Sequence, residues 1–288
     1  MPSLRRITTA VALVTGVALA LPAAASVRQS VPQARVQKLM QPKPAWYTPE
    51  LHARVMAAGA RGVPLPSGVA VPTSGLAFTG IRPGSWMIAP AGCTMNFVFG
   101  SPGSYSIGTA GHCTEKVGEA VTLVVVGPTK PTPLLVNIGT TKRTTGDGGV
   151  GNDFALVSIR PELQSWVSPS MAHWGGPTGA YTGTQRNPLV HSGHGLVVGT
   201  GGTPRAAYSL YVESNAVYWA GVTVFGDSGS AINTASGLAQ ANITHLVVDL
   251  KRPGADSAGT RITKILQLAG APLATCAKAI PWPLTGCP

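Results

Sequence analysis

The stretch Phe225-Gly226-Asp227-Ser228-Gly229-Ser230 contains a serine whose chemistry depends on residues elsewhere in the chain. A serine flanked by glycines is typical of a tight turn, on which the hydroxyl stands clear of the backbone. Gly226 has no Cβ, so its N–H can approach a bound molecule and share an oxyanion with the Ser228 N–H. Because a serine hydroxyl is a poor nucleophile without a base, the stretch requires a histidine and a carboxylate elsewhere.

Both groups lie upstream of the serine. Residues 109–113, Thr-Ala-Gly-His-Cys, place His112 at the end of an apolar, β-like run. Residues 151–157, Gly-Asn-Asp-Phe-Ala-Leu-Val, place Asp153 at the head of another. The order His112, Asp153, Ser228 is one of the orders in which catalytic triads occur.

Together the three stretches resemble the chymotrypsin-like (trypsin-fold) serine proteases, and more closely their short secreted bacterial members. That family carries T-A-[AG]-H-C, D-[FILV]-A-L and G-D-S-G-[GS] in this order, and the resemblance covers roughly residues 90–270. It implies an all-β fold of two antiparallel β-barrels with the active site between them, and no cofactor. His112 would be the base, Asp153 would orient it, Ser228 would be the nucleophile, and Gly226 with Ser228 would form the oxyanion hole.

Other polar residues near the motifs have alternative interpretations. Asp147 competes with Asp153, but it lies in a glycine-rich loop with no apolar strand directly after it. Asp227 is either an ordinary turn aspartate or an ionic anchor for the oxyanion turn. His191 and His194 form H-x-x-H, but two histidines without a third ligand or a helical context are expected to be surface residues.

The composition favours one β-rich domain with appendages. The 288 residues include 36 glycines and 25 prolines but only 11% charged residues, and glycines regularly interrupt runs of Val, Ile, Leu and Thr. This pattern is typical of strands and turns. The formal net charge is +11, yet residues 1–80 hold eight of the 21 basic residues and one of the ten acidic ones. The net charge of residues 81–288 is therefore only about +4, which argues against a nucleic-acid partner.

Residues 1–25 have the pattern of a secretory signal peptide. Arg5 and Arg6 precede an apolar core that ends at Leu21, and residues 23–25 supply a small-residue cleavage site. The core is shorter than the roughly 20 residues needed to span a bilayer. We therefore expect a secreted, extracellular protein.

Residues 26–80 are predicted to be a propeptide, with a plain flexible N-terminal extension as the alternative. Thr48-Pro49-Glu50 predicts a helix start, and Gly59 predicts its end. The proteases that this chain resembles are usually made with a pro-segment, which implies a zymogen. Residues 81–288 would form the protease domain, with the cut expected near Gly80-Ile81.

The domain is predicted to contain two lobes and a tail. The first barrel covers about residues 90–165, the second about 166–258, and a C-terminal helix and tail cover 259–288. The expected strands are Asn96–Phe99, Tyr105–Thr109, Ala120–Val126, Leu134–Arg143, Phe154–Ile159, Tyr208–Val212, Val217–Trp219 and Ile243–Val248. Ile262, Ile265 and Leu266 have helical spacing, and Gly270 follows as a stop.

Four cysteines in a chain with a secretion signal predict disulfides, for which three pairings are formally possible. We expect Cys93–Cys113, which would tether the turn bearing His112 as the family's histidine-loop disulfide does, and Cys276–Cys287, which would fasten the tail. No C-x-x-C spacing is present, so no metal site is expected.

The residues before the serine bear on substrate specificity. In trypsin-like members an aspartate six residues before the serine binds Lys or Arg, and here that position is Val222. Thr223 and His245 resemble the hydroxyl residue and histidine with which glutamyl endopeptidases of this fold hold an acidic side chain. The alternative is that His245 is an ordinary strand histidine and Val222 marks an apolar pocket.

These features predict a secreted serine endopeptidase that acts on polypeptides and is not trypsin-like in specificity, with a preference for glutamate as one of the two interpretations of its pocket. We expect a monomer with no nucleic-acid partner and no stable membrane association after signal removal. The alternative from another class is a catalytically idle secreted binding protein on the same fold. An esterase is a third interpretation, disfavoured because the motif and residue order differ from the α/β-hydrolase elbow.

Overall fold

The computed structural model describes residues 35–69, 80–127, 130–171, 174–195 and 202–279, together with Cys287. The chain divides into two units, residues 1–32 and 33–288, and every described residue lies in the second. The predicted signal peptide therefore lies outside the described residues. Within the described ranges, no helix combines the length and apolar character needed to cross a membrane.

The first sheet is antiparallel and has the strand order β4-β3-β7-β8-β9-β6-β5, with β2 also paired to β8. Its strands are β2 (Val63–Pro64), β3 (Trp86–Ile88), β4 (Gly92–Thr94), β5 (Val98–Phe99), β6 (Ser106–Thr109), β7 (Ala120–Gly127), β8 (Lys130–Thr144) and β9 (Ala155–Ile159). The chain beyond β4 returns to β6, because the Asn96 N–H donates to the Gly108 carbonyl at 2.7 Å. The sheet thus curls back on itself.

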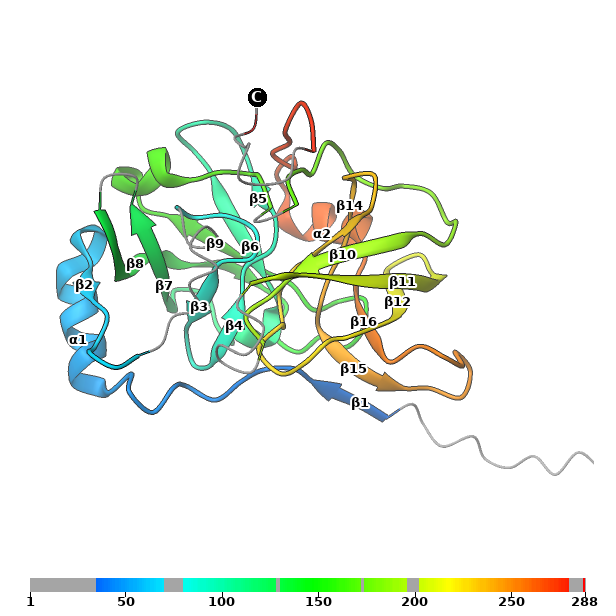
Figure 1. The fold of residues 1–288 in the computed structure, drawn as a ribbon, viewed down its shortest axis with the longest axis horizontal. Coiled ribbons are helices and arrows are strands. Elements are labelled where there is room, and N and C mark those ends of the chain that lie inside the picture. The colour runs from blue at the N-terminus through cyan, green and yellow to red at the C-terminus, as the bar shows by residue number, and fades with distance from the viewer. Residues whose placement is uncertain are drawn as a thin grey trace, which may run out of the picture. The chain divides into compact units, whose positions relative to one another are not determined.

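The second sheet is also antiparallel, in the order β1-β15-β16-β12-β11-β10-β13-β14 (Figure 1). Its strands are β1 (Arg35–Lys38), β10 (Pro188–Ser192), β11 (Pro204–Val212), β12 (Ala216–Gly221), β13 (Ala231–Thr234), β14 (Ala239–Asn242), β15 (His245–Val248) and β16 (Ser257–Thr260). With the short C-terminal helix described next, these two sheets confirm the predicted all-β fold of two antiparallel barrels.

Two α-helices form where the capping signals predict them. Helix α1 (Pro49–Ala58) begins after Thr48, whose hydroxyl accepts the Leu51 N–H at 3.2 Å, and Gly59 follows it. Helix α2 (Ile262–Ala269) ends at Gly270, a left-handed C-cap with φ 59°. Three short 3₁₀ turns complete the helical elements described: η1 (Gly59–Arg61), η2 (Gly111–Cys113) and η3 (Pro161–Trp166).

All eight predicted strands overlap observed ones, and several observed strands were not predicted. Apart from β1 and β2 of the N-terminal segment, the described strands without a predicted counterpart are β3, β4, β10, β13, β14 and β16. Each is three to five residues long, and most are buried at every position. A strand buried on both faces lacks the alternation of polar and apolar residues that identifies a strand in a sequence.

The described part of the N-terminal segment belongs to both sheets. Strand β1 adds to the edge of the second sheet beside β15, and β2 pairs with β8 of the first. Helix α1 buries Leu51 and Val55 in a cluster with Trp86 and Leu135 of the first sheet. Residues 35–69 of the segment predicted to be a propeptide or flexible extension are therefore packed as folded structure.

The predicted cut near Gly80-Ile81 falls at a buried point of the chain. Ile81 is fully buried, and its N–H donates to the Trp166 carbonyl at 2.8 Å. A protease would need this segment to open before reaching the bond. A boundary at this position remains a prediction.

An aromatic cluster joins the two sheets next to the candidate site. Phe97, Phe99 and Phe154 of the first sheet's segments pack with Ala231 and Ala239 of the second. Helix α2 covers the same cluster through its buried isoleucines. Burying a phenylalanine side chain contributes about 1.5–3 kcal/mol, so this cluster fixes the position of Phe154 and of the residue before it.

Candidate active site

Three side chains that lie far apart in the sequence meet in one hydrogen-bonded chain. Ser228 Oγ lies 2.7 Å from His112 Nε2, and His112 Nδ1 lies 2.6 Å from Asp153 Oδ2. All three residues are buried. The carboxylate accepts the Nδ1 proton, which leaves Nε2 free to accept the hydroxyl proton of Ser228. His112 and Asp153 come from the first sheet and Ser228 from the second, the distribution that the resemblance implies.

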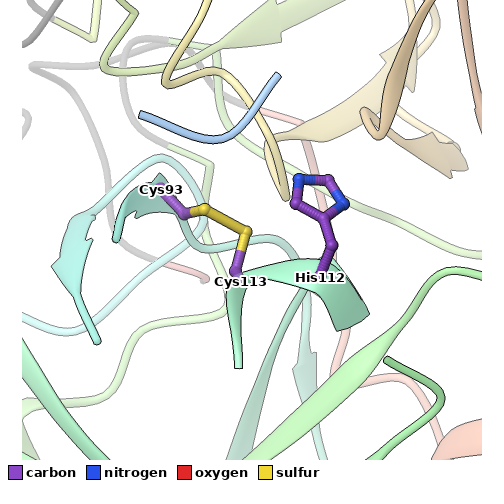
Figure 2. A group of neighbouring side chains, drawn as sticks. All are labelled: Cys93, His112 and Cys113. Carbon is purple, nitrogen blue, oxygen red and sulfur yellow. A yellow bond between two sulfur atoms is a disulfide. The ribbon is translucent and has the colours of Figure 1, made fainter. Parts of the chain in front are cut away.

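The turn that carries His112 is fixed from two sides. It forms η2, directly after β6, and the disulfide Cys93–Cys113, with an S–S distance of 2.11 Å, ties it to β4 (Figure 2). The His112 backbone N–H also donates to Asp153 Oδ1 at 3.1 Å. The second predicted disulfide, Cys276–Cys287, is formed as well. Both predicted pairings are confirmed.

Asp153 is held in place by the second sheet. Its backbone N–H donates to the Thr260 hydroxyl at 3.0 Å, and its carbonyl accepts from Asn242 Nδ2 at 3.0 Å. Thr260 ends β16 and Asn242 ends β14. Neither residue could be identified from the sequence, because neither carries a local signal that places it beside residue 153.

The turn that carries Ser228 requires glycine on both sides. Gly226 has φ 98° and Gly229 has φ 91°, values that L side chains rarely adopt. A Cβ on Gly229 would lie 2.0 Å from the Thr94 carbonyl oxygen. Thr94 in turn donates its hydroxyl to the Gly226 carbonyl at 2.8 Å and its N–H to the Ser228 carbonyl at 2.8 Å. The turn is thus fastened to β4.

Asp227 has an ionic partner that the sequence did not indicate. Arg205 Nη1 donates to Asp227 Oδ2 at 2.7 Å, and Arg205 Nη2 donates to Oδ1 at 2.5 Å. The Asp227 side chain is fully buried, and 13% of the Arg205 side chain is exposed. The Val224 N–H also donates to Oδ2 at 2.9 Å. A bidentate ion pair of this kind orients the carboxylate and also compensates its charge.

The expectation that His191 and His194 are surface residues is wrong. Both are fully buried: His191 lies on β10, which pairs with strands on both sides, and the His194 N–H, just beyond β10, donates to the buried Thr94 hydroxyl. His191 Nε2 lies 3.1 Å from the Val222 carbonyl oxygen and donates to it. Burial, reinforced by the nearby charge of Arg205, lowers the pKa of His191 to about 4. His191 is therefore neutral at pH 7.

Val222 and Thr223, the two predicted specificity residues before the serine, differ in exposure. Val222 is 64% exposed, whereas Thr223 is buried. The Thr223 hydroxyl accepts the Trp219 indole N–H at 3.4 Å. The Thr223 side chain therefore lies against the indole of Trp219.

His245 lies beside the Asp153–His112 pair. Its ring centroid is 6.1 Å from that of His112, and its Nε2 is 3.6 Å from Asp147 Oδ1 and 4.0 Å from Asp153 Oδ2. Burial lowers the pKa of His245, although the carboxylates of Asp153 and Asp147 oppose the shift. Within the described residues, His245 thus contacts the Thr244 hydroxyl at Nδ1 and groups around the candidate triad at Nε2 and the ring, and neither Val222 nor Thr223 is among these partners.

In the part of the chain that the structure describes, two groups of residues have the spacing of metal ligands, and the members of each have other partners. Cys93 and Cys113 lie beside His112, but their sulfur atoms are bonded to each other. Asp147, Asp153 and His245 offer ligand atoms within 4.8 Å of one another. In that group both oxygens of Asp153 accept hydrogen bonds from His112, and Asp147 pairs with the Lys38 ammonium at 3.0 Å.

Gly226, the predicted oxyanion donor, already has an acceptor. Its N–H donates to the carbonyl oxygen of Leu39 at 2.7 Å. Leu39 lies just beyond β1, in the N-terminal segment, and its side chain is fully buried. A backbone carbonyl of the chain itself therefore lies where we expect a substrate carbonyl.

No protein-family model matches this chain, and a search of curated proteins finds no match. Among solved structures, it is similar to Thermobifida fusca Protease A, at 17% identity and TM-score 0.46, covering 68% of this chain and 98% of that one. It is also similar to a glutamic acid specific serine protease with a histidine triad in substrate binding, at 15% identity and TM-score 0.46, covering 67% and 100%. A third similar structure is an alpha-lytic protease homologue, N4, at 14% identity and TM-score 0.41, covering 66% and 97%. At these identities and scores, function has to be argued from the geometry of this chain.

Proposed function

We propose that this chain is a serine endopeptidase, a hydrolase that cuts peptide bonds through an ester on Ser228. The observation that supports the proposal is the pair of hydrogen bonds of 2.7 and 2.6 Å that links Ser228, His112 and Asp153. A nucleophile within hydrogen-bond reach of a base, which a third group orients, is the arrangement that covalent acyl transfer requires.

In the proposed reaction, Ser228 Oγ attacks the carbonyl carbon of the substrate while His112 Nε2 takes the hydroxyl proton. Asp153 holds the imidazole in the tautomer that accepts at Nε2 and stabilises its positive charge. The N–H groups of Gly226 and Ser228 would stabilise the oxyanion that forms. His112 then donates its proton to the leaving amine, and water, activated by the same imidazole, hydrolyses the ester.

Asp153 is the carboxylate that we assign to this role, and Asp147 is not. Asp153 contacts both the imidazole and the backbone of His112. Asp147 is 42% exposed and pairs with Lys38. A carboxylate that orients a base has to be fixed itself. The hydrogen bonds that the Asp153 backbone donates to Thr260 and accepts from Asn242 provide that.

The two disulfides support a secreted, extracellular protein, because disulfides persist in oxidising compartments. We propose polypeptide substrates and synthesis as a zymogen with a signal peptide. We further propose a monomer with no nucleic-acid partner and no stable association with a membrane. Trypsin-like cleavage is disfavoured, since Val222 stands at the position that would hold the specificity aspartate.

For the substrate side chain on the acyl side of the cut, we favour an apolar pocket over a pocket that binds glutamate. The glutamyl proposal depends on Thr223 and His245 facing one acidic side chain. His245 instead lies beside the Asp147 and Asp153 carboxylates, whose negative charge would repel a substrate carboxylate.

A fluorophosphonate probe tests the proposed function against the idle binding protein. The probe reacts with an activated serine, so wild-type protein should be labelled and Ser228→Ala should not. Ser230→Ala, two residues along the same turn, is the matched control and should be labelled like the wild type. Absence of labelling in folded wild-type and Ser230→Ala protein, after removal of the N-terminal segment, would favour the binding protein.

A further inference from the structure

Residues 35–41 pass the candidate active site, with Arg35–Lys38 forming strand β1 and Gln41 making an isolated β-bridge to Gly92. Strand β1 pairs antiparallel with β15, in a register that places Lys38 opposite His245 and Val36 opposite Val247. Figure 1 shows β1, in dark blue, beside β15, in orange, and the blue chain continuing from there towards α1. The strand leads the following residues directly to the site, because His245 lies beside His112 and Asp153.

The residue after β1 is engaged as the acyl residue of a substrate would be. The Leu39 carbonyl oxygen accepts the Gly226 N–H at 2.7 Å, two residues from Ser228. A backbone N–H at this turn is the donor that the proposed mechanism assigns to the carbonyl under attack. The scissile position of the strand is therefore the bond on the carboxyl side of Leu39.

The Leu39 side chain lies in an apolar cluster of the second sheet. It is fully buried and packs with Val217, Trp219 and Ile243, among others. Trp219 donates its indole N–H to Thr223, the residue that the sequence analysis assigned to the specificity pocket. The side chain on the acyl side of the bond thus lies in an apolar pocket formed by these side chains, which suits a medium-sized apolar residue.

The chain continues past Leu39 and is held on the other side as well. The Gln41 N–H donates to the Gly92 carbonyl at 3.1 Å, and the Gly92 N–H donates to the Gln41 carbonyl at 2.9 Å. Gln41 Nε2 also donates to the Phe225 carbonyl at 2.5 Å. In Figure 2 the blue N-terminal chain passes near the disulfide, consistent with pairing next to Cys93. The bond between Leu39 and Met40 is thus held from both ends.

The residue before Leu39 makes a charged contact at the edge of the site. Lys38 Nζ lies 3.0 Å from Asp147 Oδ2, and both side chains are about 40% exposed. Burial opposes ionisation of Asp147, but the hydrogen bond and charge of Lys38 lower the pKa of its carboxyl overall. Asp147 therefore offers a negative contact for a basic side chain at this position.

We infer that residues 35–41 occupy the substrate cleft of the proposed protease as its own substrate, with the Leu39–Met40 peptide bond presented to Ser228. The inference rests on the proposed function and adds its substrate class. The enzyme takes an extended polypeptide with leucine on the acyl side of the cut and a basic residue before it. Until the bond is cut, the segment also excludes other substrates.

The step balances without a co-reactant other than water. Ser228 Oγ bonds to the Leu39 carbonyl carbon, and its proton moves to His112 Nε2. The Leu39–Met40 C–N bond breaks, and that proton passes to the Met40 nitrogen, which becomes a new amino terminus. Water then hydrolyses the Leu39 ester, returning the proton to Ser228 and leaving a carboxylate on Leu39.

The test is to produce the full chain and determine the amino terminus of the secreted protein by sequencing and intact mass. Wild-type protein should begin at Met40, and Ser228→Ala should remain uncut at this bond. In Leu39→Asp the carboxylate has to enter the apolar pocket, so the cut should slow by about 100-fold or more. Val36→Asp changes a residue of the same strand that is 42% exposed and should be cut like the wild type, as should Leu39→Met.

Fluorophosphonate labelling of the same samples tests the protease activity separately from the cut at the Leu39–Met40 bond. Labelled protein that is cut elsewhere, or that stays intact at Leu39–Met40, overturns the inference and leaves the protease standing. Equal cutting of Leu39→Asp and Val36→Asp also overturns it, because the pocket would then not select leucine. If no folded variant is labelled or cut, even after the segment has been removed, both the protease and the inference fail.

Discussion

The guanidinium of Arg205 contacts both carboxylate oxygens of Asp227, at 2.5 and 2.7 Å, one residue before Ser228. The two residues are 22 positions apart, on β11 and on the serine turn, and the carboxylate has no exposed surface. The pair therefore fixes the serine turn through Asp227, while the next residue, Ser228, contacts His112.

Removing the arginine should destabilise the fold and the turn together. Arg205→Met would leave a buried carboxylate without its partner, which costs on the order of 3–5 kcal/mol. We would measure urea unfolding in a Ser228→Ala background, so that self-cleavage does not interfere. The control is Arg160→Met, whose pair with Glu162 is 37% and 48% exposed and should contribute less than about 1 kcal/mol. Equal losses in the two variants would contradict this account of the pair.

Gly226→Ala should abolish labelling by the fluorophosphonate probe. The residue has φ 98°, and a Cβ would lie 2.6 Å from the His194 carbonyl oxygen and 2.7 Å from the Gln41 side chain. The turn would have to move, and with it the predicted oxyanion donor. Gly103→Ala is the matched control, since its φ is 84° but no atom lies within 4 Å of the added Cβ. That variant should lose only about 1–2 kcal/mol of stability and keep its labelling.

Asp153→Asn tests which carboxylate orients His112. The amide keeps the shape of the side chain but donates towards Nδ1, which favours the wrong tautomer, so kcat should fall on the order of 10³–10⁴-fold with KM little changed. Asp147→Asn should change kcat by no more than a few-fold. The rates of peptide hydrolysis by the two processed variants decide between them. A larger loss in Asp147→Asn would assign the role to the competing carboxylate.

The buried imidazole of His191 should make stability depend on pH below neutrality. Its pKa is about 4 in the folded protein, against 6.5 for an ordinary histidine. The unfolded chain then binds the extra proton between these values, so stability is full above pH 6.5 and is lost as the pH falls towards 4. The loss at pH 4 is about 3 kcal/mol for this group.

His191→Gln retains a donor for the Val222 carbonyl but does not titrate, and it provides the comparison. Urea unfolding would be measured for Ser228→Ala protein with and without His191→Gln. The two plots of unfolding free energy against pH should converge as the pH falls from 6.5 to 4. Parallel curves across this window would show that His191 does not contribute the proton.

The parts of the site that could be predicted from the sequence are those with a local signature. Ser228 lies between glycines whose positive φ values the turn requires, and His112 lies next to a cysteine that the fold uses as a tether. Arg205, Asn242 and Thr260 have no such signature, because each acts through a contact with a residue far away in sequence.

The strands of the fold, too, could be predicted only where the local sequence carries a signal. Strand β7 is apolar except at Thr122 and lies between turn residues, so its limits could be predicted to within one residue. Strands β13 and β14 are four residues each and buried at every position, so their pattern has no period. The course of residues 35–41 through the site depends on pairing with β15 and Gly92, and nothing in that segment alone indicates those partners.

Peptides based on residues 36–41, Val-Gln-Lys-Leu-Met-Gln, test the substrate preference in solution. Processed enzyme should cut the Leu–Met bond, and replacing leucine by glutamate should lower kcat/KM by about 100-fold, because a carboxylate would be desolvated in a pocket lined by Trp219 and Ile243. Equal or faster cutting of the glutamate peptide would instead support an acidic preference through Thr223 and His245.

The lysine of the same peptide tests the role of Asp147. Replacing it by alanine should lower kcat/KM only a few-fold, because a pair that is about 40% exposed contributes no more than about 1 kcal/mol. In Asp147→Asn the lysine and alanine peptides should be cut at equal rates, and raising the salt concentration should narrow the difference in the wild type. A lysine preference that survives both changes would mean that another group recognises this side chain, and Asp147 would then have no part in substrate selection.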